Sequence, residues 1–146
     1  MAETFAYSFR ATEQTARSCI SAVMEWLRGI DLPAERAGDV QIALTEAVNN
    51  IVEHAYADTL GGEISIQCDL SPKILKIRIV DTGPPLPDDE LPAGLPADIS
   101  GPLETLPEGG FGWHLIRELT SRLHYERQLD RNLLSLFFEM PAKPIG

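Results

Sequence analysis

The stretch TEAVNNIVEHAY, residues 45–56, gathers polar side chains on a segment with helical periodicity. Glu46 and Asn50 stand four residues apart, so on a helix their side chains are neighbours. A carboxylate beside an amide oxygen is suited to holding a hard metal ion and positioning a water or hydroxyl. Two successive asparagines also lower helix stability unless something uses them. These features favour a chemical role for Glu46 and Asn50. A solvent-exposed helix face formed by Glu46, Asn50 and Glu53 would explain the same row of polar residues.

A second candidate is Asp81, which ends an alternating segment in the sequence KILKIRIVD. It shares the parity of Ile77 and Ile79, so a continued strand would point it toward the side that helices cover. An acid aimed inward needs hydrogen-bond donors to satisfy it. A turn aspartate that caps DTGPP accounts for this residue equally well.

The third candidate is the sequence EGGFGWHLI, in which Gly109, Gly110 and Gly112 precede or open a helix. The free N–H groups and the dipole at a helix start favour an anion such as phosphate. Hinge glycines would produce the same pattern, so this signal is weak by itself.

Local periodicity predicts the elements that must position these residues. Strands are expected at 4–10, 61–70 and 73–81, and helices at 12–29 and at 31–56. A loop rich in proline and glycine covers 82–112, and two strands joined by a turn at LDRN end the chain. Between the loop and these strands, a third helix is marked by Leu115, Ile116, Leu119 and Leu123. This order predicts an α+β fold: a two-layer sandwich with a mixed sheet and helices on one face.

Composition narrows the class of protein. The 146 residues suit one domain, and neither a membrane span nor a signal peptide is visible, so we expect a cytoplasmic protein without membrane contact. The net charge of −10 argues against nucleic acid as a partner and leaves basic proteins or metal-bound nucleotides. Cys19 and Cys68 lie in apolar patterns on different elements and are expected to be core residues.

Taken in order, the motifs resemble one superfamily. EAVNN on a helix, DTGPP at a strand end, a long loop and GGFG at a helix start resemble the N, G1 and G2 boxes of the GHKL ATP-binding group. The resemblance covers about residues 5–140 and implies the GHKL, or Bergerat, fold. EAVNNIVEHAY and EGGFGWHLIREL look most like the stand-alone anti-sigma-factor serine/threonine kinases.

The resemblance implies a role for each candidate residue. Asn50 matches the asparagine that coordinates Mg²⁺ on the ATP phosphates, and Glu46 matches the general base toward an attacking hydroxyl. Asp81 matches the carboxylate that accepts a hydrogen bond from the adenine amino group. Gly83 matches the glycine that lets the backbone approach the base.

The remaining implied positions bind phosphate. Gly109, Gly110, Phe111 and Gly112 match the phosphate-binding loop, and residues 84–108 would form the ATP lid. Phe111 stands where some relatives carry a basic side chain. Glu108 replaces a usual glycine and Trp113 a smaller apolar residue, so phosphate binding is expected to depend strongly on Mg²⁺.

The resemblance therefore implies an ATP-dependent protein serine/threonine kinase of one domain, residues 1–146, that doubles as an anti-sigma factor. Its substrate would be an anti-sigma-factor antagonist, its other partner a sigma factor, and it would form a homodimer. Two alternatives stay open: a nucleotide-dependent binding module without phosphoryl transfer, and a histidine-kinase-like ATP-binding domain.

Overall fold

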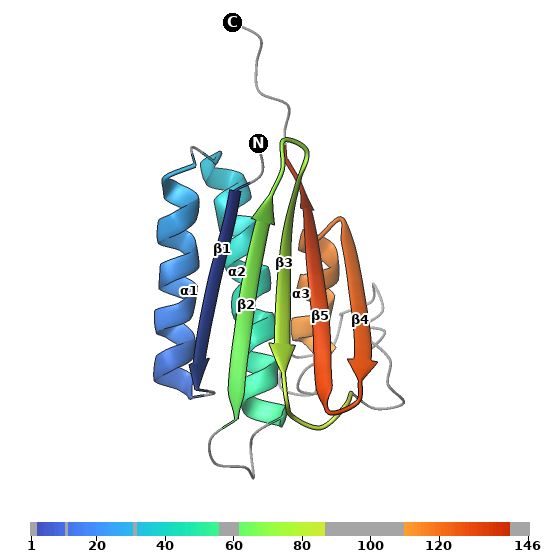
Figure 1. Cartoon of the computed structure of the whole chain (residues 1–146). Helices are drawn as coiled ribbons and strands as arrows, with labels where there is room; N and C mark the ends of the chain where they lie inside the picture. The colour runs from blue at the N-terminus through green and yellow to red at the C-terminus, as the bar shows by residue number, and fades with distance from the viewer. Residues whose placement is uncertain (1–2, 11, 31, 56–61, 87–109, 141–146) are drawn as a thin grey trace, which may run out of the picture.

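The computed structural model describes residues 3–10, 12–30, 32–55, 62–86 and 110–140, in which helices cover one face of a five-stranded sheet (Figure 1). The predicted two-layer α+β sandwich and the predicted order of its elements are confirmed. The elements are β1 (Glu3–Arg10), α1 (Glu13–Arg28), α2 (Ala34–Asn50), the π-helical turn η1 (Ile51–Ala55), β2 (Glu63–Leu70), β3 (Ile74–Asp81), α3 (Gly110–Leu119), β4 (Arg122–Gln128) and β5 (Arg131–Glu139).

The sheet order is β1-β2-β3-β5-β4, and all four of its pairings are antiparallel. The prediction of a mixed sheet is therefore wrong. Two antiparallel helices, α1 and α2, connect β1 to β2, so the second strand returns in the opposite direction (Figure 1). β3 and β4 do run parallel to each other, but they are not neighbours. β5 follows β4 after a tight hairpin turn, lies between the two strands and pairs antiparallel with both.

The core lies between the sheet and the helices. The burial of alternate residues along β2 and β3 confirms that Ile77 and Ile79 face inward, against the apolar side of α2. Cys19 and Cys68 are fully buried free thiols, which confirms them as core residues, and burial raises the pKa of each to about 12. None of the helices in the described ranges is long and apolar enough to cross a membrane.

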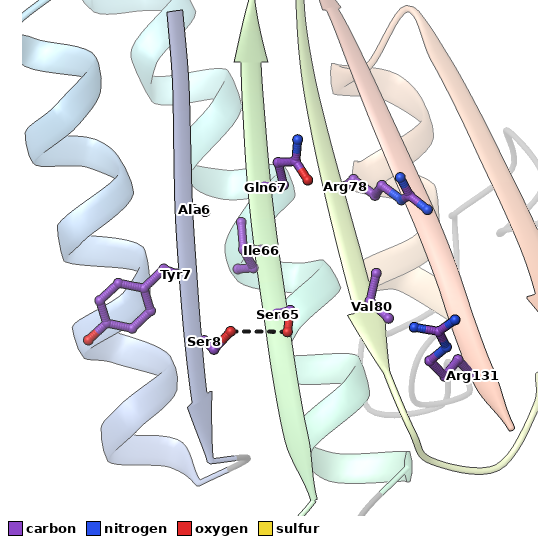
Figure 2. A pocket seen from close by; sticks show the side chains of 9 residues that line it. All are labelled: Ala6, Tyr7, Ser8, Ser65, Ile66, Gln67, Arg78, Val80 and Arg131. Atoms are coloured by element: carbon purple, nitrogen blue, oxygen red, sulfur yellow. Dashed lines mark hydrogen bonds between the residues drawn. The ribbon is translucent and has the colours of Figure 1, made fainter.

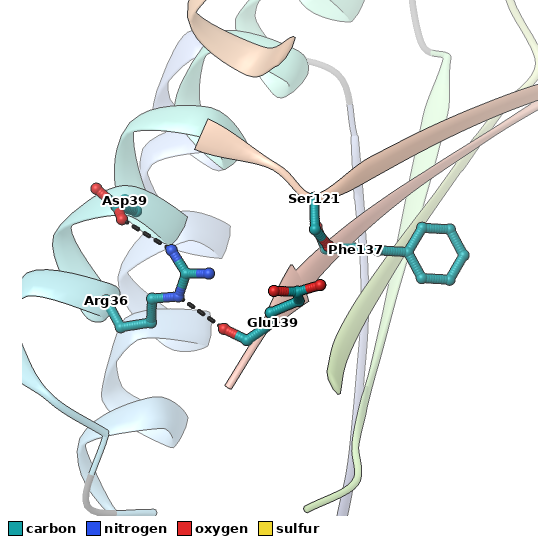
Figure 3. Close-up of polar contacts among 5 residues, drawn as sticks. All are labelled: Arg36, Asp39, Ser121, Phe137 and Glu139. Atoms are coloured by element: carbon teal, nitrogen blue, oxygen red, sulfur yellow. Dashed lines mark hydrogen bonds and ion pairs between the residues drawn. The ribbon is translucent and has the colours of Figure 1, made fainter. Parts of the chain in front are cut away.

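The two long helices start differently. Thr12 and Thr15 form a reciprocal capping box at the start of α1. The first turn of α2 follows Pro33 and has no side-chain cap. Arg36 instead ties this turn to the sheet, since its Nε donates to the Glu139 carbonyl at 2.8 Å and its Nη1 pairs with Asp39 at 3.1 Å (Figure 3).

The third helix is shorter than predicted, because it ends at Leu119 and Leu123 lies in β4. The Ile116 carbonyl accepts both the Thr120 N–H at 3.1 Å and the Thr120 hydroxyl at 2.7 Å, which completes the last turn of the helix. Ser121 then donates through its N–H and its hydroxyl to the Phe137 carbonyl, at 2.8 and 3.0 Å, which starts the sheet pairing (Figure 3).

Candidate nucleotide-binding site

Three of the predicted segments meet at one end of the sandwich. The C-terminal end of α2, the C-terminal end of β3 and the start of α3 all lie at the lower end of Figure 1. The antiparallel path of the chain places them there, because α2 and β3 run toward this end and α3 departs from it. The contact from Arg36 lies at the opposite end, where it holds the beginning of α2.

The start of α3 packs directly on Glu46 and Asn50. A methyl group added at Gly112 would lie 2.8 Å from Glu46 Oε2 and 3.6 Å from both polar atoms of the Asn50 amide. Glycine allows this close approach as the side chains stand, and any larger residue here would have to displace the carboxylate end of Glu46. Glu46 and Asn50 are half-buried, so the solvated-face interpretation is wrong for them, whereas Glu53 in η1 is exposed.

Asn50 carries an unusual polar atom. Its Nδ2 is buried and has no hydrogen-bond partner within the described ranges. A buried donor left without an acceptor costs about 1–3 kcal/mol, a cost that a bound oxygen ligand would remove. The π-helical turn η1 begins at the next residue, and such turns inside α-helices frequently occur at functional sites.

Asp81 satisfies both interpretations of its sequence. It faces inward at the end of β3 and is only 4% exposed. Its Oδ1 also caps the following turn, because it accepts the Gly83 N–H at 2.9 Å. The same oxygen accepts a hydrogen bond from Asn132 Nδ2 at 3.0 Å.

Asn132 stands directly opposite Asp81, because the two residues pair in register across β3 and β5. It is 5% exposed, and the carbonyls of Gly83 and Pro84 also lie within hydrogen-bond distance of its Nδ2, at 3.2 and 2.9 Å, so three acceptors share its two N–H groups. Asn132 was not among the residues predicted from the sequence. Asn132 lies two residues from the apolar Leu134 and therefore on the same face of the strand, the pattern that also predicted an inward-facing Asp81.

Two residues of β4 complete the polar network and were also missed. Arg127 Nη1 donates to Asn132 Oδ1 at 3.1 Å and to the Gly83 carbonyl at 2.8 Å. The Tyr125 hydroxyl donates to Asn132 Oδ1 at 2.5 Å and accepts the Leu86 N–H at 3.0 Å. The network thus holds Asp81 and the backbone of residues 83–86 together.

Burial raises the pKa of the Asp81 carboxyl above its usual range. The hydrogen bonds from Asn132 and Gly83 and the positive charge of Arg127 oppose that rise without cancelling it. A carboxylate in this environment is a strong acceptor for an N–H group, because little water competes for it.

Only some of the residues predicted to bind phosphate lie within the described ranges. Gly110 and Phe111 open α3, and of Phe111 the structure describes the backbone alone. Gly109 lies outside the described residues, as does the predicted lid of 84–108 apart from its first three residues. Gly112 is buried against Glu46 and Asn50, as described above.

A separate shallow hollow lies on the face of the sheet away from the helices (Figure 2). Arg78 and Arg131 give it a basic side, and the hydroxyls of Ser8 and Ser65 lie 3.1 Å apart within it. None of the predicted site residues lines this hollow.

The chain is similar to known sequences of one family of ATPase domains. The sequence pattern of the histidine kinase-like ATPase domain matches residues 9–138. The chain belongs to this family. The protein is also 43% identical over 82 residues to serine-protein kinases RsbW of Bacillus cereus strain AH820 and Bacillus thuringiensis strain Al Hakam. The match covers 56% of this chain and 51% of theirs, so it spans about half the length of these curated relatives.

Solved structures confirm the ATPase-domain fold. The RsbU and RsbW domains of Rv1364c from Mycobacterium tuberculosis superpose with a TM-score of 0.66 at 19% identity, over 99% of this chain and 34% of that one. The histidine kinase domain of the blue-light activated kinase EL346 from Erythrobacter litoralis superposes with a TM-score of 0.52 at 17% identity, over 86% of this chain and 61% of that one. The predicted GHKL fold is therefore correct.

Replacing Asp81 with asparagine should change how the stability of the protein depends on pH. Because the folded state raises the pKa of Asp81, the folded protein binds this proton more tightly than the unfolded chain. The contribution of Asp81 to stability therefore falls as pH rises from the unfolded pKa through the folded one. Asp81→Asn stays neutral and can still accept from Gly83 and Asn132, so its stability relative to wild type should increase with pH.

Calorimetric unfolding between about pH 4 and about pH 8 would measure this difference, at about 3 °C per kcal/mol for a chain of this size. A variant that loses stability relative to wild type as pH rises would contradict the inferred cost of burying this carboxylate.

Adding a methyl group at Gly112 should reveal the contact between α3 and Glu46. Replacing a helical glycine with alanine generally stabilises a protein by about 0.5–1 kcal/mol. Gly38 in α2 is the matched control, since a methyl group there meets nothing within 4 Å. Urea unfolding should show the full gain for Gly38→Ala and a smaller gain, or a loss, for Gly112→Ala. Equal gains would show that the Glu46 carboxylate moves aside without cost, and would contradict an energetically important contact between Glu46 and α3.

Proposed function

We propose that this chain is an ATP-dependent protein serine/threonine kinase that doubles as an anti-sigma factor. The observation that carries the proposal is the packing of the α3 start on Glu46 and Asn50, with an unpartnered buried donor on Asn50. A helix start presents free N–H groups suited to phosphate, and Asp81 offers an acceptor at the same end of the sandwich. Membership of the ATPase family and similarity to serine-protein kinases RsbW support it.

In this proposal the nucleotide lies between α2, β3 and α3. Asp81 accepts a hydrogen bond from the adenine amino group, and Gly83 gives the base room beside the backbone. The N–H groups of the segment from Gly109 to Gly112, which includes Gly110 and Phe111, bind phosphate oxygens.

Asn50 is the proposed protein ligand to Mg²⁺. Mg²⁺ in nucleotide sites takes one or two protein ligands together with the phosphates, and it neutralises phosphate charge when bound. The Asn50 amide fits this arrangement, because its oxygen is a metal ligand and its unpartnered Nδ2 suits a phosphate oxygen.

Glu46 is the proposed general base. One helical turn separates it from Asn50, so a carboxylate stands beside the proposed metal ligand and against the start of α3. Its role would be to accept the proton of a serine or threonine hydroxyl as that hydroxyl attacks the terminal phosphate.

The proposed partners are an anti-sigma-factor antagonist, which is phosphorylated, and a sigma factor, which is bound and inhibited in the cytoplasm. A homodimer also stays a prediction, for which β1 offers a strand at the edge of the sheet. Its aromatic residues Phe5, Tyr7 and Phe9 pack against the core of the monomer. Light scattering of the protein at tens of micromolar would decide between monomer and homodimer. Residues 84–108 remain the proposed lid of a single domain.

The kinase proposal is tested by a pair of substitutions on α2. Asn50→Ala should weaken Mg-ATP binding, because it removes the metal ligand. Glu46→Gln keeps size and helix preference, so ATP should still bind, while phosphoryl transfer to the antagonist falls by about 10²–10⁴. Calorimetry measures ATP binding, and labelled ATP with the antagonist encoded nearby measures transfer.

Binding of the sigma factor should persist in Glu46→Gln, which serves as the control for folding. Transfer by Glu46→Gln at the wild-type rate would remove the base assignment. A wild type that binds Mg-ATP but phosphorylates no candidate antagonist would favour a nucleotide-dependent binding module.

A further inference from the structure

The side-chain amide of Asn132 is held in one orientation by its neighbours. A guanidinium can only donate, so Arg127 Nη1, at 3.1 Å, requires the amide oxygen on its side. Backbone carbonyls can only accept, so those of Gly83 and Pro84, at 3.2 and 2.9 Å, require the amide nitrogen on theirs. Since Asn132 is 5% exposed, little water is available to replace any of these partners.

This orientation makes Asn132 a donor toward Asp81. Its Nδ2 lies 3.0 Å from Asp81 Oδ1, which also accepts the Gly83 N–H. Because Asp81 Oδ1 accepts two N–H groups, these hydrogen bonds stabilise the ionised form of the carboxyl group, which can only accept. Such a carboxylate pairs with a base edge that carries an amino group and mismatches one that carries a carbonyl oxygen.

We propose that Arg127, Asn132 and Tyr125 are positioning residues that make the site selective for adenine over guanine nucleotides. They act through Asp81, whose carboxylate they hold as an acceptor. The inference rests on the proposed nucleotide site and extends it to residues of β4 and β5 that the sequence motifs do not include.

Arg127 supports this arrangement in two ways. Its second hydrogen bond, to the Gly83 carbonyl at 2.8 Å, holds the backbone that the base would approach. Its positive charge also favours the ionised form of Asp81, against the effect of burial.

Tyr125 links the same amide to the chain that leaves the site. Its hydroxyl donates to Asn132 Oδ1 and accepts the Leu86 N–H, at 2.5 and 3.0 Å. Asn132 therefore cannot rotate without releasing either Arg127 or the segment of residues 83–86.

The test compares three substitutions of arginine in β4. Arg127→Gln introduces a side chain that can donate or accept, so it no longer dictates which way Asn132 faces. Arg127→Lys keeps a donor-only cation at the same position. Arg122→Gln is the matched control, because Arg122 lies on the opposite face of the strand, over the Phe137 ring.

Calorimetry with Mg-ATP and Mg-GTP gives the ratio of the two dissociation constants. Wild type should prefer ATP by about 100-fold or more, as expected of a site that reads a hydrogen-bonding edge. Arg127→Gln should reduce this ratio by about tenfold, the effect of one charged hydrogen bond. Arg127→Lys should restore most of the preference, and Arg122→Gln should leave it unchanged.

The outcomes separate this inference from the proposed function. If wild type prefers ATP and Arg127→Gln keeps the full preference, the positioning role is wrong while the nucleotide site stands. If wild type binds neither nucleotide, the proposed function fails and the inference fails with it. Should Arg127→Gln lose its far-ultraviolet circular dichroism, Tyr125→Phe replaces it, since it removes only the hydroxyl. An unchanged ratio in Tyr125→Phe would then overturn the inference.

Discussion

The candidate site depends on a carboxylate buried at the margin of the core. Asp81 continues the inward row of Ile77 and Ile79 but carries a charge, which costs several kcal/mol to bury unless donors compensate it. The fold supplies those donors from Gly83 and Asn132. The sheet order matters here, because the insertion of β5 between β3 and β4 is what places Asn132 opposite Asp81.

The second half of the site depends on a missing side chain. Gly112 lets the backbone of α3 lie against Glu46 and Asn50 without displacing the Glu46 carboxylate, which an added methyl group would meet at 2.8 Å. The approach leaves Asn50 Nδ2 buried without an acceptor, a defect that costs stability in the isolated protein. Such a cost at the meeting point of two helices is typical of a site organised for a ligand, because function there outweighs local stability.

Periodicity was sufficient to predict the elements and the direction of several side chains, but not the neighbours that complete the site. Alternation predicted that Asp81 points inward, and the same alternation in β5 marks Asn132. Asn132 was overlooked because it lies beside the turn at Asp130. Asparagine is common in turns, where its side chain forms hydrogen bonds with the nearby backbone. The contact between Gly112 and Glu46 joins residues far apart in sequence, so no local pattern contains it.

The two errors of the fold prediction have the same origin. Leu123 follows Leu119 by four residues, a helical spacing, yet the pairing of Ser121 with Phe137 places it in a strand. The sheet appeared mixed because strand order is a property of the whole fold. Only the position of β5 between the parallel β3 and β4 makes every neighbouring pair antiparallel.

The central claim is that the ends of α2 and β3, with Asn132 of β5 and the start of α3, form one nucleotide site. Titration of the isotope-labelled protein with Mg-ATP, followed by nuclear magnetic resonance, tests it most directly. The side-chain amides of Asn50 and Asn132 and the backbone amides of Gly83 and Gly112 should shift together, with one dissociation constant. The side-chain amide of Gln67, in the hollow on the opposite face, should stay unchanged. Shifts at Gln67 without shifts at Asn50 and Asn132 would contradict the account.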